Sequence, residues 1–199
     1  MKTMKPKIIV AQVTTWARAL TAALATVGKK REPKEPGDRW KAKMLLAEHS
    51  PIRLVEYDIL IERVRTWVLG HLVRHWIGWI PFVGTQRADR NAGVTDRDAL
   101  PQGSLNDARF AANAQSLITI SRKRLCRKAS PETREAWEGV KEAVRGVDPV
   151  MASKMVPECV YRGFCPELEC CGYCNRAKFI EELREYRREA LENGQKDWL

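Results

Sequence analysis

The stretch His71-Leu72-Val73-Arg74-His75-Trp76, with the polar loop after it as far as Thr85-Gln86-Arg87, decides how this chain is interpreted. Arg74 and His75 place a guanidinium and an imidazole immediately before that loop. The planar fork of a guanidinium suits the oxygens of a phosphate group. The stretch therefore predicts a site where an anion is held.

The two histidines of this stretch also allow a zinc interpretation. His71 and His75 have the i, i+4 spacing of a His-x-x-x-His site. In zinc proteases the residue after the first histidine is a glutamate that acts as general base, whereas Leu72 stands here, and no third ligand is evident nearby. Taken alone, the segment is best interpreted as histidines that pack or cap a helix.

Apolar periodicity and capping residues predict a chain of alternating strands and helices. Val55, Tyr57, Ile59 and Ile61 alternate with polar residues, which is typical of a half-buried strand. The charged stretch 29–43 and the stretch 78–91 are expected to be loops. The expected strands are 8–13 and 52–61. The expected helices are 15–27, 62–76 with His71 and His75 along one stripe, 108–126 with a cap at Ser104, 130–145 with a cap at Ser130, 148–157 with a cap at Asp148, and 176–193.

Residues 45–134 resemble the flavin-dependent thymidylate synthases in three separate blocks that follow the family's order. The family signature is Arg-His-Arg, a short spacer and Ser-x-Arg; Arg74-His75 matches its start, and Thr85-x-Arg87 matches its end with one extra spacer residue. The other blocks are Arg97-x-x-Leu100-Pro101 and Asn113-Ala114-Gln115-Ser116-Leu117, with Arg124 eleven residues after Asn113.

The resemblance implies an architecture and an activity. The fold would be α/β, with a mixed sheet and long helices, and the chain would assemble as a homotetramer whose active sites are shared between subunits. Residues 1–150 would form the catalytic domain, and residues 151–199 a cysteine-rich segment and C-terminal helix packed on it. The activity would be methylation of dUMP to dTMP with FAD as cofactor and with methylenetetrahydrofolate and NADPH as co-substrates.

The same resemblance assigns roles to individual residues. Arg124 and Arg87 would fix and activate the pyrimidine as the catalytic pair. The further substrate contacts would come from His71, Arg74, Thr85 and Arg97, and the flavin contacts from Arg74, His75 and Asn113. Four arginines would suit the nearly two negative charges of a nucleotide phosphate.

One departure from the family pattern widens the functional alternatives. Trp76 stands at the third position of Arg-His-Arg, where it removes a charged flavin contact but brings an indole that could stack on or near the flavin ring. Two alternatives therefore stay open. One is hydroxymethylation of a pyrimidine nucleotide, and the other is a non-catalytic descendant that binds nucleotide or nucleic acid.

Five of the six cysteines lie between residues 159 and 174. Such clustering in a reducing cytosol indicates a metal more than disulfides. The cysteine set resembles that of family members from bacterial viruses, which suggests a tetrahedral zinc site made by Cys126, Cys159, Cys165 and Cys171. Cys170 and Cys174 are possible substitutes. An iron–sulfur cluster and reduced, packed cysteines also remain open.

Charge and hydropathy limit the partners. The 35 Lys and Arg residues against 25 Asp and Glu residues give a net charge of +10, which favours an anionic partner such as a nucleotide. No apolar run of about 18 residues occurs, so we expect no membrane span. The expected location is the cytoplasm of a bacterial or phage-infected bacterial cell.

Overall fold

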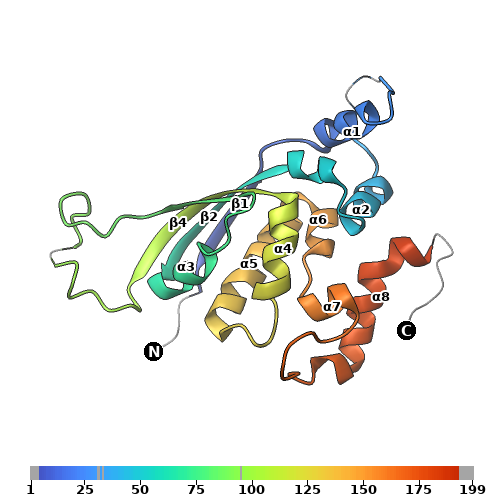
Figure 1. Ribbon diagram of the computed structural model, residues 1–199. Helices are drawn as coiled ribbons and strands as arrows, with labels where there is room; N and C mark the ends of the chain where they lie inside the picture. Colours follow the sequence, from blue (N-terminus) through green and yellow to red (C-terminus); the bar gives the residue numbers. More distant parts are fainter. Residues whose placement is uncertain (1–4, 31, 33, 95, 193–199) are drawn as a thin grey trace.

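The computed structural model describes residues 5–30, 32, 34–94 and 96–192, and its centre is a four-stranded sheet (Figure 1). The spatial order is β1-β2-β4-β3, and each neighbouring pair is antiparallel. The prediction of a mixed sheet is therefore wrong for the described residues. The strands are β1 (Lys7–Gln12), β2 (Glu56–Arg65), β3 (Trp79–Val83) and β4 (Leu105–Asn113).

Helices pack on one side of the sheet, and α4 and α5 lie along that face (Figure 1). As the sequence predicted, Ser130 and Asp148 cap helices, because each side chain accepts a backbone N–H of the first turn. The expected end of the last helix, Asn193, lies outside the described residues. The helices are α1 (Trp16–Ala25), α2 (Asp38–Leu46), α3 (Thr66–Leu72), α4 (Ala114–Arg124), α5 (Pro131–Val147), α6 (Pro149–Lys154), α7 (Glu158–Arg162) and α8 (Ala177–Leu191), with 3-10 turns at Ser50–Leu54 and Tyr173–Asn175.

The main core lies between the sheet and α5. The alternation predicted for β2 is confirmed, since Tyr57, Ile59 and Ile61 are buried. Trp79 of β3 stacks on Phe110 with ring centroids 4.3 Å apart, and it also meets Trp137 of α5 edge-on. These aromatic contacts fix β3 and β4 against α5 and so hold in place the turn that precedes β3.

A second, smaller core belongs to the C-terminal segment. Lys154, at the end of α6, is buried and donates to the Glu189 carboxylate at 2.5 Å and to the Tyr186 carbonyl at 2.9 Å, which ties α8 to the rest of the chain. Figure 1 shows α7 and α8 together beside the lower end of α4. The buried residues of this core are Val156, Cys159, Val160, Tyr173, Phe179, Leu183 and Tyr186.

The predicted helix over 108–126 is wrong in its first part. Leu105–Asn113 is strand β4, and the helix begins at Ala114 with Asn113, not Ser104, as its cap. Ala108 and Phe110 are buried between their neighbours in the sheet. Pairing with strands on both sides overrides the helical preference of the alanines.

Three other boundaries also differ from prediction. Residues 62–65 extend β2 past a bulge at Arg63, whose φ is +61° and whose N–H donates to Asp107, so the helix starts only at Thr66. Residues 79–83, expected in a loop, form β3, where Pro81 is tolerated because the strand lies at the sheet edge. Part of the expected loop 29–43 belongs to α2.

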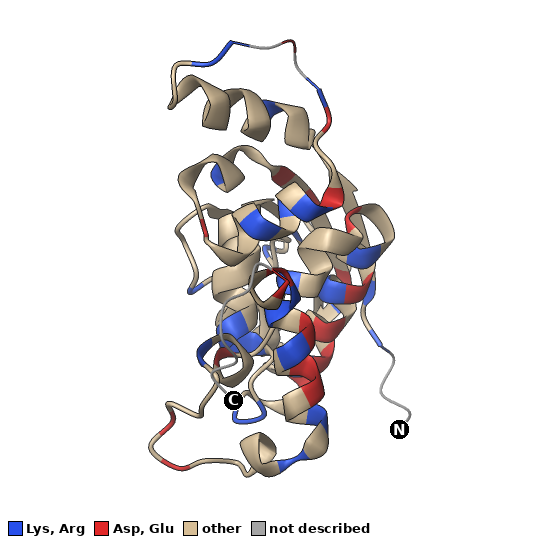
Figure 2. Ribbon diagram, turned by 90° about the vertical axis from the view of Figure 1, so that its right-hand side faces the viewer, with Lys and Arg blue, Asp and Glu red and all other residues tan. Residues whose placement is uncertain are grey.

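Charge is spread over the molecule. Figure 2 shows Lys and Arg segments interspersed with Asp and Glu segments on the helices seen from that side. The net charge therefore does not by itself mark a binding face in this view. None of the described helices has both the length and the apolar character needed to cross a membrane.

Candidate functional site

Arg124, the last residue of α4, connects the end of α3 to the residues beyond it. Its Nη2 donates to the His71 carbonyl at 2.5 Å, and its Nε donates to His75 Nε2 at 3.0 Å. A carbonyl in the last turn of a helix lacks a helical partner, so the guanidinium satisfies a group that would otherwise need water. Two bonds thus fix the orientation of Arg124.

His75 is a neutral imidazole in this arrangement. Burial and the nearby Arg124 charge lower its pKa to about 4. Because a guanidinium keeps its protons, Nε2 of His75 must be the acceptor, and the ring proton lies on Nδ1. His75 lies beyond the end of α3, so the prediction that it shares a helical stripe with His71 is wrong.

His71 is held by the start of α5. Its Nδ1 lies 2.8 Å from Oγ1 of Thr133, a buried hydroxyl that also accepts a hydrogen bond from Ser130. Burial, together with the charges of Arg124 and Arg74, lowers the His71 pKa. The histidine therefore connects α3 to α5 and stays neutral near pH 7.

Two arginine charges lie together at this junction, and no carboxylate of the described residues neutralises them. Burial lowers the pKa of Arg124, and so does the neighbouring charge of Arg74. Within the described ranges, neither guanidinium forms an ion pair with an acidic side chain. Close by in sequence, the indole of Trp76 is 78% exposed. We name this group of Arg74, His75, Trp76 and Arg124 the junction site; chemically it can accept an anion and a planar ring.

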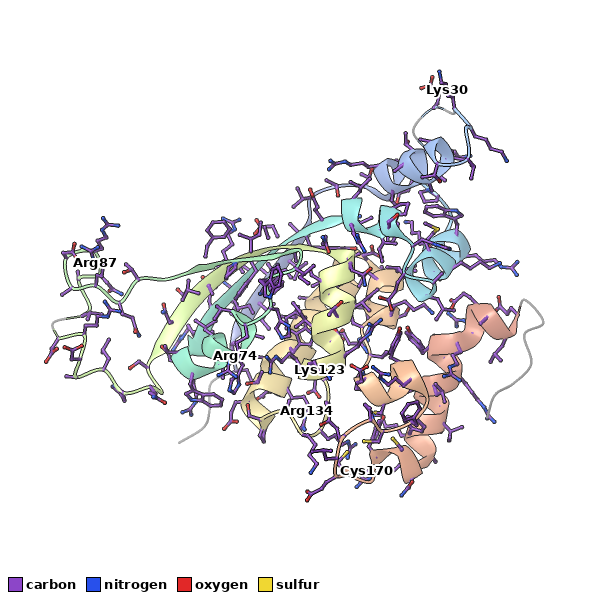
Figure 3. All side chains as sticks on the ribbon, viewed as in Figure 1. Lys30, Arg74, Arg87, Lys123, Arg134 and Cys170 are labelled. Carbon is purple, nitrogen blue, oxygen red and sulfur yellow. The ribbon has the colours of Figure 1, made fainter. Side chains whose placement is uncertain are left out.

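The other predicted substrate residues lie elsewhere. Thr85, Arg87 and Arg97 are exposed on the loop between β3 and β4. Arg87 forms a bidentate pair with Asp89 at 2.9 and 2.7 Å, and its N–H donates to the Thr85 hydroxyl. Figure 3 shows Arg87 near the outer end of this projecting loop, away from Arg74. Within one chain, the structure does not bring these residues together with Arg124.

Asn113 serves as a helix cap. Its Oδ1 accepts the Ser116 N–H at 2.9 Å, while its own N–H contacts the Ser116 hydroxyl and the Gly78 carbonyl. Gly78 has a φ of +66°, and a Cβ there would lie 2.4 Å from the Asn113 amide nitrogen, so only glycine fits without a shift. Asn113 is thereby packed against the turn that follows Trp76.

One half-buried group was missed by the sequence reasoning. Glu48, in the left-handed region with φ +50°, accepts from Gln115 at 2.5 Å and pairs with Arg122. The Arg122 guanidinium lies 3.5 Å from the ring centroid of Tyr161 in α7. These contacts join α4 to Glu48 and to α7. The Asn-x-x-Ser spacing could have predicted the Asn113 helix cap from the sequence, whereas no local pattern in the sequence predicts that Glu48 pairs with Arg122.

The cysteines gather at the C-terminal segment. The sulfurs of Cys165, Cys170 and Cys174 lie within 4.8 Å of one another, so of the four predicted metal ligands only Cys165 belongs to this group of described side chains. A cavity of about 880 Å³ beside it is lined by the other three, Cys126, Cys159 and Cys171, among other residues. The described cysteines are all free thiols. No residue of the junction site lines this cavity.

Comparison with known proteins identifies the fold. No family model and no curated protein sequence matches the chain. Thymidylate synthase X from Helicobacter pylori, solved with FAD and dUMP, superposes with a TM-score of 0.63 at 14% identity, covering 76% of this chain and 99% of that one. The UMP/dUMP methylase PolB from Streptomyces cacaoi, bound with 5-Br dUMP, gives 0.57 at 15% identity, covering 80% and 97%. The chain has the fold of these nucleotide methylases in a divergent form.

Proposed function

We propose that this protein is a divergent flavin-dependent thymidylate synthase that methylates dUMP to dTMP. The observation that carries the proposal is the junction site, where Arg74 and Arg124 have no carboxylate partner among the described side chains, in a fold shared with proteins solved with dUMP or its 5-bromo analogue. A nucleotide phosphate or an electron-rich pyrimidine carbonyl is the kind of acceptor that such paired guanidinium groups bind.

The chain's own residues would bind and orient the pyrimidine. Arg124 keeps its orientation through His71 and His75, so its remaining donors can meet a substrate oxygen without reorganisation. Because His75 is neutral, it adds no charge repulsion to the two arginines. His71 would hold the end of α3 in position through its hydrogen bond to Thr133, and it would add no charge to the site.

Thr85, Arg87 and Arg97 would complete the site from another subunit. These residues lie on a loop that projects from the body (Figure 3), and the described structure pairs Arg87 there with the exposed Asp89. Exposed pairs of this kind are weak, so a phosphate can replace Asp89 at little cost. The proposal therefore includes a homotetramer with shared sites.

FAD fits the donor set next to this position. Arg74 offers an exposed charge for the cofactor's phosphates, and the exposed Trp76 indole offers a face for a flat ring. His75 and Asn113 would contribute hydrogen bonds. When bound, reduced flavin supplies the hydride, methylenetetrahydrofolate the carbon, and NADPH the electrons that reduce the flavin again.

A turnover assay with product mass tests this proposal. Purified protein reconstituted with FAD is incubated with dUMP, methylenetetrahydrofolate and NADPH, and we expect dTMP. A hydroxymethylated product would show that the protein catalyses hydroxymethylation instead of methylation. Nucleotide binding without any product would indicate a non-catalytic descendant of the fold. Lys123→Ala is the matched control for Arg124→Ala, because both changes remove one cation at adjacent positions of α4.

A mixing experiment tests the shared site. Arg124→Ala and Arg87→Ala proteins are each expected to be inactive, and their unfolding and refolding together should restore part of the activity, because mixed tetramers contain some sites built from two intact halves. Absence of any recovery, with mixed tetramers verified by native mass spectrometry, would place all site residues on one subunit.

A further inference from the structure

The loop between α7 and α8 brings three thiols together. The sulfurs of Cys165, Cys170 and Cys174 lie within 4.8 Å of one another, and Figure 3 shows sulfur atoms gathered beside Cys170. Thiolates bound to one zinc ion at about 2.3 Å in a tetrahedron are about 3.8 Å apart. A contraction of at most about 1 Å would therefore let all three sulfurs reach one ion.

The backbone of this loop is shaped to support such a group. Gly172 adopts φ +74°, and its N–H donates to the Cys170 sulfur at 3.3 Å. A backbone N–H directed at a sulfur stabilises negative charge on it, which favours the thiolate that a metal requires. Gly163, with φ +87°, turns the chain at the end of α7 so that Cys165 can return toward Cys174.

We propose that Cys165, Cys170 and Cys174 bind a structural zinc ion, with Cys159 of α7 as the fourth ligand. Cys159 is a buried thiol that lines the same cavity as Cys165 and Cys174. The set differs from the one that the family resemblance suggested, because Cys170 and Cys174 replace Cys126 and Cys171. Four sulfurs and no oxygen donor favour zinc, and a tight single group favours one ion over a cluster.

The proposed ion would stabilise a region that has little core of its own. The C-terminal core contains seven buried residues, and residues 163–176 have only the turn Tyr173–Asn175 as regular structure. Small cores of this kind gain stability from a bound metal. A zinc ion joining α7 to the start of α8 would hold both against α4 and would keep Tyr161 over Arg122.

Nearby basic side chains are suited to the charge of the filled site. Zinc with four thiolates carries two net negative charges. The Arg127 guanidinium lies 4.3 Å from the ring centroid of Tyr173, inside the same loop, and Lys128 pairs with Glu169 at 3.4 Å. These cations come from the segment just after α4, so the metal also connects this segment electrostatically to the C-terminal unit.

Metal analysis of the full-length protein, purified anaerobically with reductant, tests the proposal. We expect one zinc ion per chain by mass spectrometry, and Co²⁺ in its place should give the intense visible and charge-transfer bands of four thiolates. Cys165→Ser, Cys170→Ser and Cys174→Ser should each weaken zinc binding by more than about 100-fold, since even outer partners of a metal site account for 10–100-fold. Cys171→Ser, next to Cys170 in sequence, should keep full occupancy.

Cysteine alkylation of the wild-type protein tests the same ligand set and does not depend on whether a variant folds. With zinc present, Cys165, Cys170 and Cys174 should resist alkylation while Cys126 and Cys171 react, and a chelator should remove that protection. Protein that contains no metal and takes up neither Zn²⁺ nor Co²⁺ would overturn the site. Loss of metal in Cys171→Ser or Cys126→Ser but not in Cys170→Ser would overturn the ligand set.

Discussion

The two places that carry the proposed nucleotide-binding residues differ in how they are built. At the junction site, Arg124 at the end of α4 is fixed by the His71 carbonyl at the end of α3 and by His75. On the projecting loop, the Arg87 guanidinium pairs, among the described side chains, with an exposed aspartate two residues away. The first arrangement is preorganised by the chain itself, whereas the second depends on what the loop meets.

Because of this difference, substitutions at the two places should affect nucleotide binding and folding stability in different proportions. Arg124 of the junction site contributes to both, since its bond to the His71 carbonyl also closes the end of α3. A loop residue contributes to binding alone, because an exposed ion pair adds only about 0–1 kcal/mol to folding. Paired measurements of dUMP affinity and of the free energy of unfolding therefore distinguish the two regions.

Arg124→Ala should give the largest effect. It removes the substrate contact and both internal bonds, so we expect dUMP affinity to fall by about 100-fold or more and stability to fall by about 1–3 kcal/mol. Calorimetric titration and urea unfolding measure the two quantities. Lys123→Ala should leave affinity within about twofold, because Lys123 is exposed and only its pair with Glu158 is lost.

Arg87→Ala should lower affinity without loss of stability. We expect dUMP binding about 10–100-fold weaker, because one charge-assisted contact is lost, and a free energy of unfolding within about 0.5 kcal/mol of the wild type. Arg90→Ala, in the same loop, is the matched control for charge. Equal losses of dUMP affinity in Arg87→Ala and Arg90→Ala would show that Arg87 acts through its charge alone and not through a specific contact.

Asn113 allows capping to be separated from cofactor binding. Asn113→Ala should lower stability by about 1 kcal/mol through loss of the cap and should also weaken FAD binding. Asn113→Asp keeps the cap acceptor but loses the amide donor, so stability should be retained while flavin affinity falls. Flavin binding unchanged in Asn113→Asp would restrict Asn113 to its capping role.

The last expected effect, absent near neutral pH, is a pH dependence from His75. Its pKa is about 4 in the folded chain and near 6.5 when unfolded, so only the unfolded chain takes up this proton between those values. The contribution to stability is complete above pH 6.5 and decreases as pH falls toward 4. Urea unfolding of the wild type and of His75→Asn should show a shallower decline in the variant, and parallel declines would contradict the neutral imidazole.

Local patterns in the sequence predicted the elements whose cause is local. The alternation of β2 and the caps at Ser130 and Asp148 depend on neighbouring residues, and the structure confirms them. Strand β4 depends instead on partners far along the chain, since its alanine-rich segment becomes a strand between β2 and β3. The edge strand β3 was hidden by Pro81, which usually indicates a loop.

The candidate site was predictable to a similar degree. Motif resemblance selected Arg74, His75 and Arg124, and the structure places these residues together at one junction. The resemblance could not show that Arg124 is oriented by the His71 carbonyl, because that contact joins residues 53 positions apart in the sequence. Cysteine spacing likewise indicated a cluster but not its members, since the turns at Gly163 and Gly172 decide which sulfurs meet.

The central claim is that the junction site and its flavin bind a pyrimidine nucleotide together. The most direct measurement is the visible absorbance of the FAD-reconstituted protein while dUMP is titrated in, repeated with Arg124→Ala and Lys123→Ala. We expect flavin bands that shift with dUMP in the wild type and in Lys123→Ala but not in Arg124→Ala. A protein that takes up no FAD, or flavin bands that ignore dUMP, would contradict it.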